Sequence, residues 1–141
     1  MDAVRRYRAR ISGPLLDRID LHVEVPRLPP SELRTDAAPG EASVAIRVRV
    51  VQARERQHAR AGKPNANLNQ AETGAHCRLC EGDQALLERA VEALQLSARS
   101  MHRILRVART IADLDGSDAI RTAHLTEAIN YRCADRASRS A

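Results

Sequence analysis

The sequence predicts a mainly α-helical protein, and three observations lead to that fold class. Apolar residues recur at helical spacing in several segments of the C-terminal half. Short loops separate these segments, as they do in a helical bundle. Phe and Trp are absent and the aromatic residues are Tyr7 and Tyr131, so the core must consist of Leu, Ile, Val, Ala and Met. Such a core suits close-packed helices better than an aromatic-rich pair of sheets.

The N-terminal part contains two short predicted elements and then a linker. Residues 11–20 predict a short helical turn, with Pro14 suited to a first helical position. Residues 21–25 alternate apolar and polar side chains, which is the pattern of a half-buried strand, and Pro26 ends it. Residues 27–40 are rich in Pro, Ala and polar residues. Because one strand is not stable by itself, we expect its neighbours to lie outside this sequence.

Residues 41–61 fit two patterns. Val and Ile alternate with Ala and Arg over residues 44–50, as in a strand. One face of a helix would instead carry Val44, Val48 and Val51. Residues 52–60 favour a helix, and Gly62 is a stop signal. The length of the segment favours a helix that begins at about residue 41.

Residues 63–74 are rich in Asn and are expected to form a loop, after which three helices follow. The first begins after Gly82 and Asp83, and its apolar residues are Leu86, Leu87, Ala90, Val91 and Leu94. The second begins near its N-cap Ser97 and ends at Asp115-Gly116, and its apolar face contains Met101, Ile104, Leu105, Ala108, Ile111 and Ala112. The third runs from about residue 122 to 132 and presents Leu125, Ala128 and Ile129.

Composition excludes several classes of protein. The N-terminus lacks the apolar stretch of a secretory signal, and no run approaches the roughly 18 apolar residues of a membrane helix, so a cytoplasmic location without a membrane partner is expected. The net charge of +5 and the pI near 9.8 permit a polyanionic partner. However, the arginines are spread along the chain. Three cysteines without an export signal argue against a disulfide framework.

The sequence predicts no metal site. Cys77 and Cys80 have the spacing of half a structural zinc site, but a closed site needs four ligands. Apart from Cys133, only distant histidines could complete it. Asp113 and Asp115 are interpreted as turn residues near a helix end.

Two strings resemble parts of one protein family. ISGPLLDRIDLHVEVP, residues 11–26, resembles the segment that ends the ATPase core of magnesium-chelatase-like AAA+ proteins of the ComM/YifB group. LSARSMHRILRVARTIADLDG, residues 96–116, followed by HLTEAINYR, resembles the helical lid of the same proteins. The resemblance implies an AAA+ helical lid bundle preceded by a short remnant of the α/β ATPase core. The expected division is 1–26 for the end of the core, 27–40 for a linker, 41–136 for the lid and 137–141 for a disordered tail.

The resemblance also implies two arginines with roles at ATP. Arg18 matches an arginine finger that reaches the nucleotide of the neighbouring subunit, where a guanidinium stabilises charge on the phosphoryl oxygens. In another interpretation it only pairs at the surface with Asp17, Asp20 or Glu24. Arg99 matches the lid arginine, sensor 2, that contacts nucleotide bound to its own subunit, and it lies in the first turn of its helix. The other arginines of this helix, Arg103 and Arg106, are interpreted as a solvated basic face.

A P-loop, G-x-x-x-x-G-K-[ST], is absent from this sequence. Lys63, the one lysine, lies in AGKP, which lacks the first glycine and has proline where the hydroxyl belongs. The chain is therefore not expected to hydrolyse ATP by itself. ATP and Mg²⁺ are expected in the full-length protein, with none bound to this chain alone. The expected partners are the missing upstream ATPase core and further copies in a homo-oligomer, a hexameric ring.

DNA is the substrate that the resemblance implies, since the ComM/YifB group is linked to competence and DNA processing. Nonspecific contact could involve the lid arginines or residues 5–10. The alternative function is a stand-alone basic helical module that binds nucleic acid or a protein partner. A sequence-specific helix-turn-helix is disfavoured, because the helix after residues 115–118 carries buried-type residues. Insertion of magnesium into a tetrapyrrole would rest on fold analogy alone.

Overall fold

The computed structural model describes residues 15, 18–23, 25–29 and 40–137, with the backbone alone described for residues 133–137. Its elements are α3 (Ser43–Ala61), the 3-10 turn η2 (Asn65–Asn67), α4 (Gln70–His76), α5 (Glu81–Ala93), α6 (Ala98–Leu114) and α7 (Thr122–Ala137). The described part of the chain contains helices and no strand, which confirms the mainly α fold class. None of the described helices is both long and apolar enough to cross a membrane.

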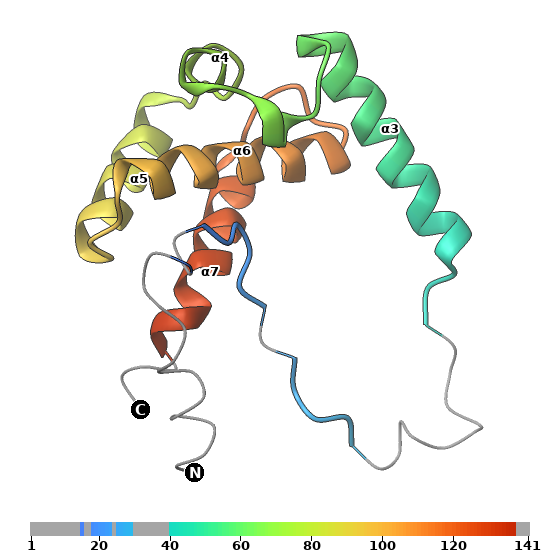
Figure 1. Ribbon diagram of the computed structural model, residues 1–141, viewed down its shortest axis with the longest axis horizontal. Helices are drawn as coiled ribbons and strands as arrows, with labels where there is room; N and C mark the ends of the chain where they lie inside the picture. The colour runs from blue at the N-terminus through green and yellow to red at the C-terminus, as the bar shows by residue number, and fades with distance from the viewer. Residues whose placement is uncertain (1–14, 16–17, 24, 30–39, 138–141) are drawn as a thin grey trace.

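Helix α6 is the centre of the arrangement. It runs across the middle of the structure, with α3 at one end and α5 near the other (Figure 1). It packs against α7, α3, η2 and α4, while α5 contacts α7. The apolar face predicted for α6 is confirmed, because Ile104, Ala108 and Ala112 have no exposed surface. Leu87 of α5 and Leu125 of α7 complete the centre of the same core.

The ends of α6 follow the signals in the sequence. Ser97 is the N-cap, and its hydroxyl accepts a hydrogen bond from the amide of Ser100 at 3.1 Å. After the helix, Gly116 has a φ of 72°, the left-handed conformation that glycine adopts without strain. Both boundaries were predicted. Helix α7 begins where predicted and continues beyond Arg132 to Ala137, the first residue of the tail that was expected to be disordered.

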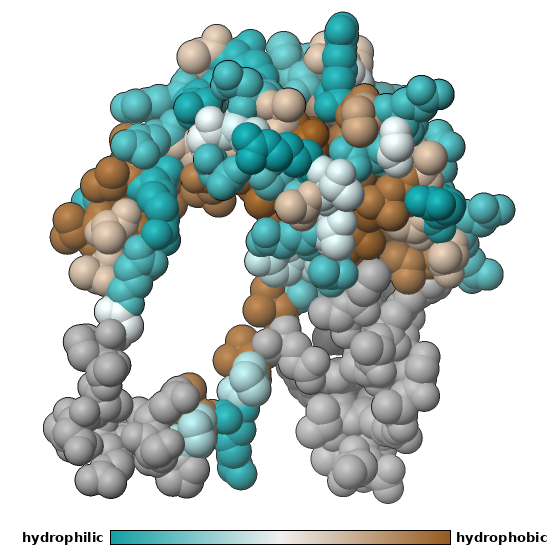
Figure 2. All heavy atoms as spheres, turned by 180° about the vertical axis from the view of Figure 1, so that it is seen from behind, coloured by the Kyte–Doolittle hydropathy of each residue, from teal (hydrophilic) through white to brown (hydrophobic). Residues whose placement is uncertain are grey.

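The segment that fitted both a strand and a helix is helical. Helix α3 ends at Gly62, whose φ is 68° and whose amide bonds to the carbonyl of His58. The C-terminal half of α3 packs on α6 through Ala53 and Gln57. The N-terminal half is exposed on all sides, and Figure 2 shows its hydrophobic side chains uncovered.

Two sequence expectations were wrong. Residues 63–74 are not a loop throughout, since they contain η2 and the start of α4. The signal was a capping box: the side chain of Asn69 accepts from the amide of Glu72, and Glu72 accepts from the amide of Asn69. The described part of the expected strand, residues 21–23 and 25, is irregular. No strand among the described residues pairs with it, and Val23 and Val25 remain 65% and 82% exposed.

The remaining expectations fall partly outside the described residues. Within the expected helical turn of residues 11–20, the amide of Arg18 bonds to the carbonyl of Leu15 at 3.0 Å, and residues 11–14, 16 and 17 are not described. Of the expected linker, residues 27–29 and 40 are irregular and exposed, and 30–39 are not described. Residues 138–141 of the expected tail also lie outside the described part.

A buried carboxylate joins α3 to α6. The side chain of Asp113 has no exposed surface and accepts hydrogen bonds from Arg60 of α3 and, at 2.8 Å, from Asn65. Arg109 lies 3.1 Å from the same carboxylate and donates to the carbonyl oxygens of Ser117 and Asp118. The interpretation of Asp113 as a turn residue was therefore wrong. Asp115 does lie at the helix end, where it meets His124 at 3.2 Å.

Asp113→Asn should destabilise the fold by about 3–5 kcal/mol, because it leaves the buried guanidinium of Arg109 without a countercharge. Urea denaturation followed by circular dichroism measures the change. The control is Asp118→Asn, which removes a fully exposed partner of Arg56 and should leave the unfolding midpoint nearly unchanged. Equal effects of the two substitutions would contradict the role given to Asp113.

Candidate functional site

Residues 18–22 lie against helices α6 and α7 and are held there by hydrogen bonds. The guanidinium of Arg103, on α6, donates to the backbone carbonyl of Arg18 and to the carboxylate of Asp20, the latter at 2.6 Å. Arg132, on α7, donates to the carbonyl of Ile19. The amide of His22 donates to the carbonyl of Tyr131 at 2.9 Å. The segment predicted to end an ATPase core is thus fixed on the surface of α6 and α7.

The side chain of Arg18 is exposed, although its backbone is held. Its guanidinium forms no hydrogen bond or ion pair with any residue that the structure describes. The alternative of a surface pair with Asp20 does not apply, since that carboxylate accepts from Arg103. Asp17 and Glu24 lie outside the described residues. Arg18 therefore presents a charged group from a fixed stretch of backbone.

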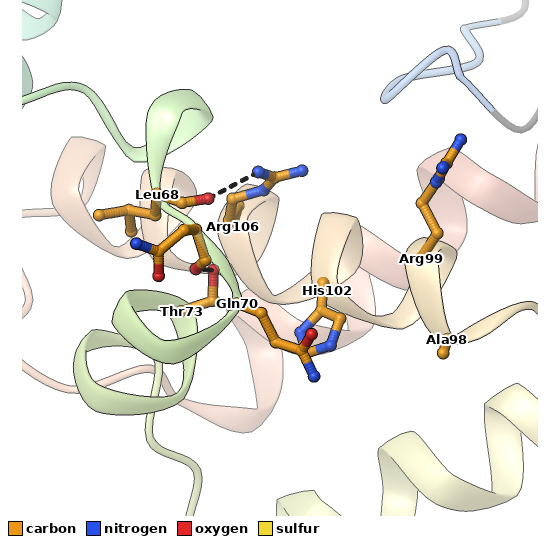
Figure 3. Close-up of a pocket in the computed structure, with 8 residues that line it drawn as sticks. Leu68, Gln70, Thr73, Ala98, Arg99, His102 and Arg106 are labelled. Carbon is orange, nitrogen blue, oxygen red and sulfur yellow. Dashed lines mark hydrogen bonds between the residues drawn. The ribbon is translucent and has the colours of Figure 1, made fainter.

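Arg99 lies in the first turn of α6, as predicted, and is exposed. Within the described part of the chain its guanidinium has no partner. It borders an open pocket of about 310 Å³ between α6 and the start of α4 (Figure 3). The other residues that line this pocket are Leu68, Asn69, Gln70, Thr73, Ala98, His102 and Arg106. In Figure 3 the side chain of Arg99 points away from His102 and Gln70, toward the side of α6 on which Arg106 also extends.

The interpretation of Arg103 and Arg106 as a solvated basic face was wrong. The side chain of Arg103 is only 17% exposed and is bound to residues 18 and 20. Arg106 donates to the carbonyl oxygens of Leu68, at 2.9 Å, and Ala66, at 3.2 Å. Helical spacing alone placed both residues opposite the apolar face, but it carries no information about segments 38 to 85 residues away. Of the arginines on this side of α6, Arg99 is the one left unpaired in the described structure.

Cys77, Cys80 and Lys63 lie in contacts that belong to the fold and form no metal or phosphate site among the described residues. Cys77 is buried, and burial raises the pKa of its thiol to about 11. Cys80 is exposed, and its thiol donates to Asp83 at 3.2 Å. Among the described residues, no three His, Cys, Asp or Glu side chains are close enough together to hold a metal ion. Lys63 lies 2.7 Å from Glu72, and this hydrogen bond is the main cause of the lowered pKa of that carboxyl.

Comparison with known proteins places most of the chain in one family. The family described as "Magnesium chelatase, subunit ChlI C-terminal" matches residues 40–132. The family described as "Magnesium chelatase, subunit ChlI" matches residues 1–33. The change from one match to the other falls within the predicted linker, residues 27–40.

Several curated relatives align with almost the whole chain. "Competence protein ComM" of Haemophilus influenzae is 49% identical over 129 residues, which is 92% of this chain and 25% of the relative. "Uncharacterized protein YifB" of Escherichia coli is 48% identical over 131 residues, 93% of this chain and 26% of the relative. An uncharacterized protein of Mycobacterium tuberculosis is 34% identical over 132 residues. The chain thus spans about a quarter of the length of these relatives.

Proposed function

Because this chain belongs to the magnesium chelatase ChlI family, we propose that it is the lid portion of an oligomeric AAA+ ATPase and supplies two arginines to its ATP sites. The C-terminal family matches residues 40–132, and the relatives are about four times as long as the matched part. The observation that carries the proposal is the contrast at Arg18. Hydrogen bonds hold its backbone, yet its guanidinium is exposed and unpaired among the described residues.

Arg18 acts on the nucleotide of the neighbouring subunit. Negative charge on the transferred phosphoryl group is spread over its oxygens, and a guanidinium that arrives from outside stabilises it. Such a group must be presented outward, because it has to cross a subunit boundary. An exposed side chain on a fixed backbone meets that requirement, since little conformational freedom of the main chain remains to be lost when it binds.

Arg99 contacts the nucleotide of its own subunit. It lies where α6 begins, and the positive end of the helix dipole also favours an anion there. The guanidinium has no competing carboxylate among the described residues. Rotation of the lid would carry Arg99 toward or away from ATP, so the nucleotide state would set the lid angle.

The rest of the nucleotide site belongs to the upstream core. The described residues offer no acidic cluster for Mg²⁺, and the sequence has no P-loop. Mg²⁺ and the phosphate cradle are therefore assigned to the part of the protein that this chain lacks, and this portion contributes cationic side chains. An arginine that acts across a subunit boundary requires a homo-oligomer, and we propose a hexameric ring.

DNA is the substrate we propose for the ring. The chain carries a net charge of +5. On α3, Arg47 and Arg54 are exposed, lie seven residues apart on one side of the helix, and have no partner in the described structure. The same two residues are the observation in favour of the alternative, a basic helical module that binds nucleic acid by itself. The name of the Haemophilus relative, competence protein, agrees with a DNA substrate.

Subunit mixing tests the two arginines in the full-length protein. Arg18→Ala should lower ATP turnover by about a thousandfold and leave ATP binding nearly unchanged. Mixing these subunits with subunits whose P-loop lysine is replaced should restore turnover, because the second type still offers Arg18 to the neighbour. Arg99→Ala subunits should not be rescued by the same partner, since Arg99 acts within its own subunit.

Steady-state ATPase assays of each variant and each mixture provide the measurement. Arg89→Ala is the control, because this residue is exposed on α5 and its substitution should preserve turnover. Full turnover in Arg18→Ala, or rescue of Arg99→Ala, would contradict the assignment.

Binding of a fluorescent DNA duplex by the isolated chain separates the two functions. A lid portion should bind weakly, with a dissociation constant no tighter than roughly 10⁻⁵ M at physiological salt. Replacing Arg47 and Arg54 by Ala should reduce the slope of log K against log salt concentration by roughly 0.9 for each arginine. Arg49→Ala is the matched control, since Arg49 is already paired with Glu41 at 2.6 Å, and it should change the slope less. Tight binding by the isolated chain would favour the stand-alone module.

A further inference from the structure

The segment that carries Arg18 is attached to the lid mainly by polar contacts. Its apolar side chains are only partly buried: Ile19 is 41% exposed, Leu21 47% and Val23 65%. Hydrophobic burial therefore supplies only part of what holds the segment, and both ring nitrogens of His22 are buried without a hydrogen-bond partner in the described part of the chain. The hydrogen bonds from Arg103 and Arg132 and the backbone bond between His22 and Tyr131 supply the directional contacts that fix its position.

Arg103 lies on the same helix as Arg99 and contacts the Arg18 segment directly. It follows Arg99 by four residues, so the two lie one turn apart on the same side of α6. Its guanidinium donates to the carbonyl of Arg18 itself and to the carboxylate of Asp20. Charge-assisted hydrogen bonds of this kind are the strong ones, and their geometry depends on the planar guanidinium.

Arg132 of α7 also holds the Arg18 segment, and it contacts α6 as well. Arg132 is 8% exposed. One of its nitrogens donates to the carbonyl of Ile19 and another to the hydroxyl of Ser100 at 2.8 Å. Ser100 directly follows Arg99 in the first turn of α6. Arg132 therefore connects the Arg18 segment to the turn of α6 that bears Arg99, and Arg103 connects it to the next turn.

We infer that Arg103 is a positioning residue that ties the Arg18 segment to the Arg99 helix, so that the lid and the arginine offered to the neighbouring subunit move as one body. The inference rests on the proposed function and deepens it. A change in lid angle, set by the nucleotide of one subunit through Arg99, then shifts Arg18 at the nucleotide of the next. Adjacent ATP sites are coupled through this contact.

Amide hydrogen exchange in the 141-residue chain tests whether Arg103 holds the Arg18 segment on α6. Arg103→Met keeps the length of the side chain but removes its donors, and the amide of His22 should exchange about tenfold faster, because its bond to Tyr131 opens more often. Arg106→Met is the matched control: it also removes an arginine from α6, but one that contacts Ala66 and Leu68. It should leave the exchange of His22 unchanged. Equal exchange rates in Arg103→Met and the unchanged protein would overturn the inference.

A double-mutant cycle in the full-length protein tests whether Arg103 acts through Arg18. Arg103→Met should lower kcat at least about tenfold with an unchanged dissociation constant for ATP, and Arg103→Lys should recover only part of it. Added to Arg18→Ala, Arg103→Met should cause no further loss of kcat. If the two substitutions lower kcat by factors that multiply in the double variant, the inference is overturned. A normal kcat in Arg103→Met, when Arg18→Ala has a low kcat, would also overturn it.

Failure of the proposed function can be distinguished from failure of the role inferred for Arg103. If Arg18→Ala retains full turnover, the proposed function is contradicted, and so is the coupling that rests on it. The exchange of the His22 amide still decides whether Arg103 holds the segment, because that measurement requires neither ATP nor an oligomer.

Discussion

The guanidinium of Arg103 holds the backbone of Arg18 and the carboxylate of Asp20 against helix α6. Without such contacts, a short segment whose apolar side chains are only partly buried would be held more weakly on α6 and α7. With them, a charged side chain can remain free while its main chain is fixed. The functional proposal depends on this separation, since an arginine that serves a neighbouring subunit has to be both unpaired in its own subunit and well positioned.

Helix α6 supplies the frame for this arrangement. Its apolar face is buried against α5 and α7, which fixes its rotation about its own axis. Toward its C-terminal end, Asp113 joins it to α3 through Arg60 and to η2 through Asn65. Toward its N-terminal end, Arg103 joins it to residues 18–20. Helix α6 thus contributes its apolar face to the core and the side chains of Asp113 and Arg103 to ion pairs. It also bears Arg99, whose guanidinium is unpaired among the described residues.

Local patterns in the sequence predicted the elements of the fold but not the contacts between them. The apolar face of α6, its cap at Ser97 and its end at Gly116 follow from residues within one or two turns of each other. Arg103 and Asp113 both have partners that lie 48 to 85 residues away, which no helical pattern could reveal. Arg109 lies four residues before Asp113, so the spacing within α6 was compatible with that one ion pair. The capping box of Asn69 and Glu72 is a local signal for the start of α4, but the Asn-rich composition around it is typical of a loop.

We propose that Arg99 contacts ATP in its own subunit while Arg18 contacts ATP in the next. A structure of the full-length assembly with a non-hydrolysable ATP analogue tests this most directly. We expect Arg99 within hydrogen-bonding distance of the nucleotide's phosphates and Arg18 at the γ-phosphate of the adjacent subunit, with Arg103 still bound to the carbonyl of residue 18. Arg18 turned into its own subunit, away from any nucleotide, would contradict the account.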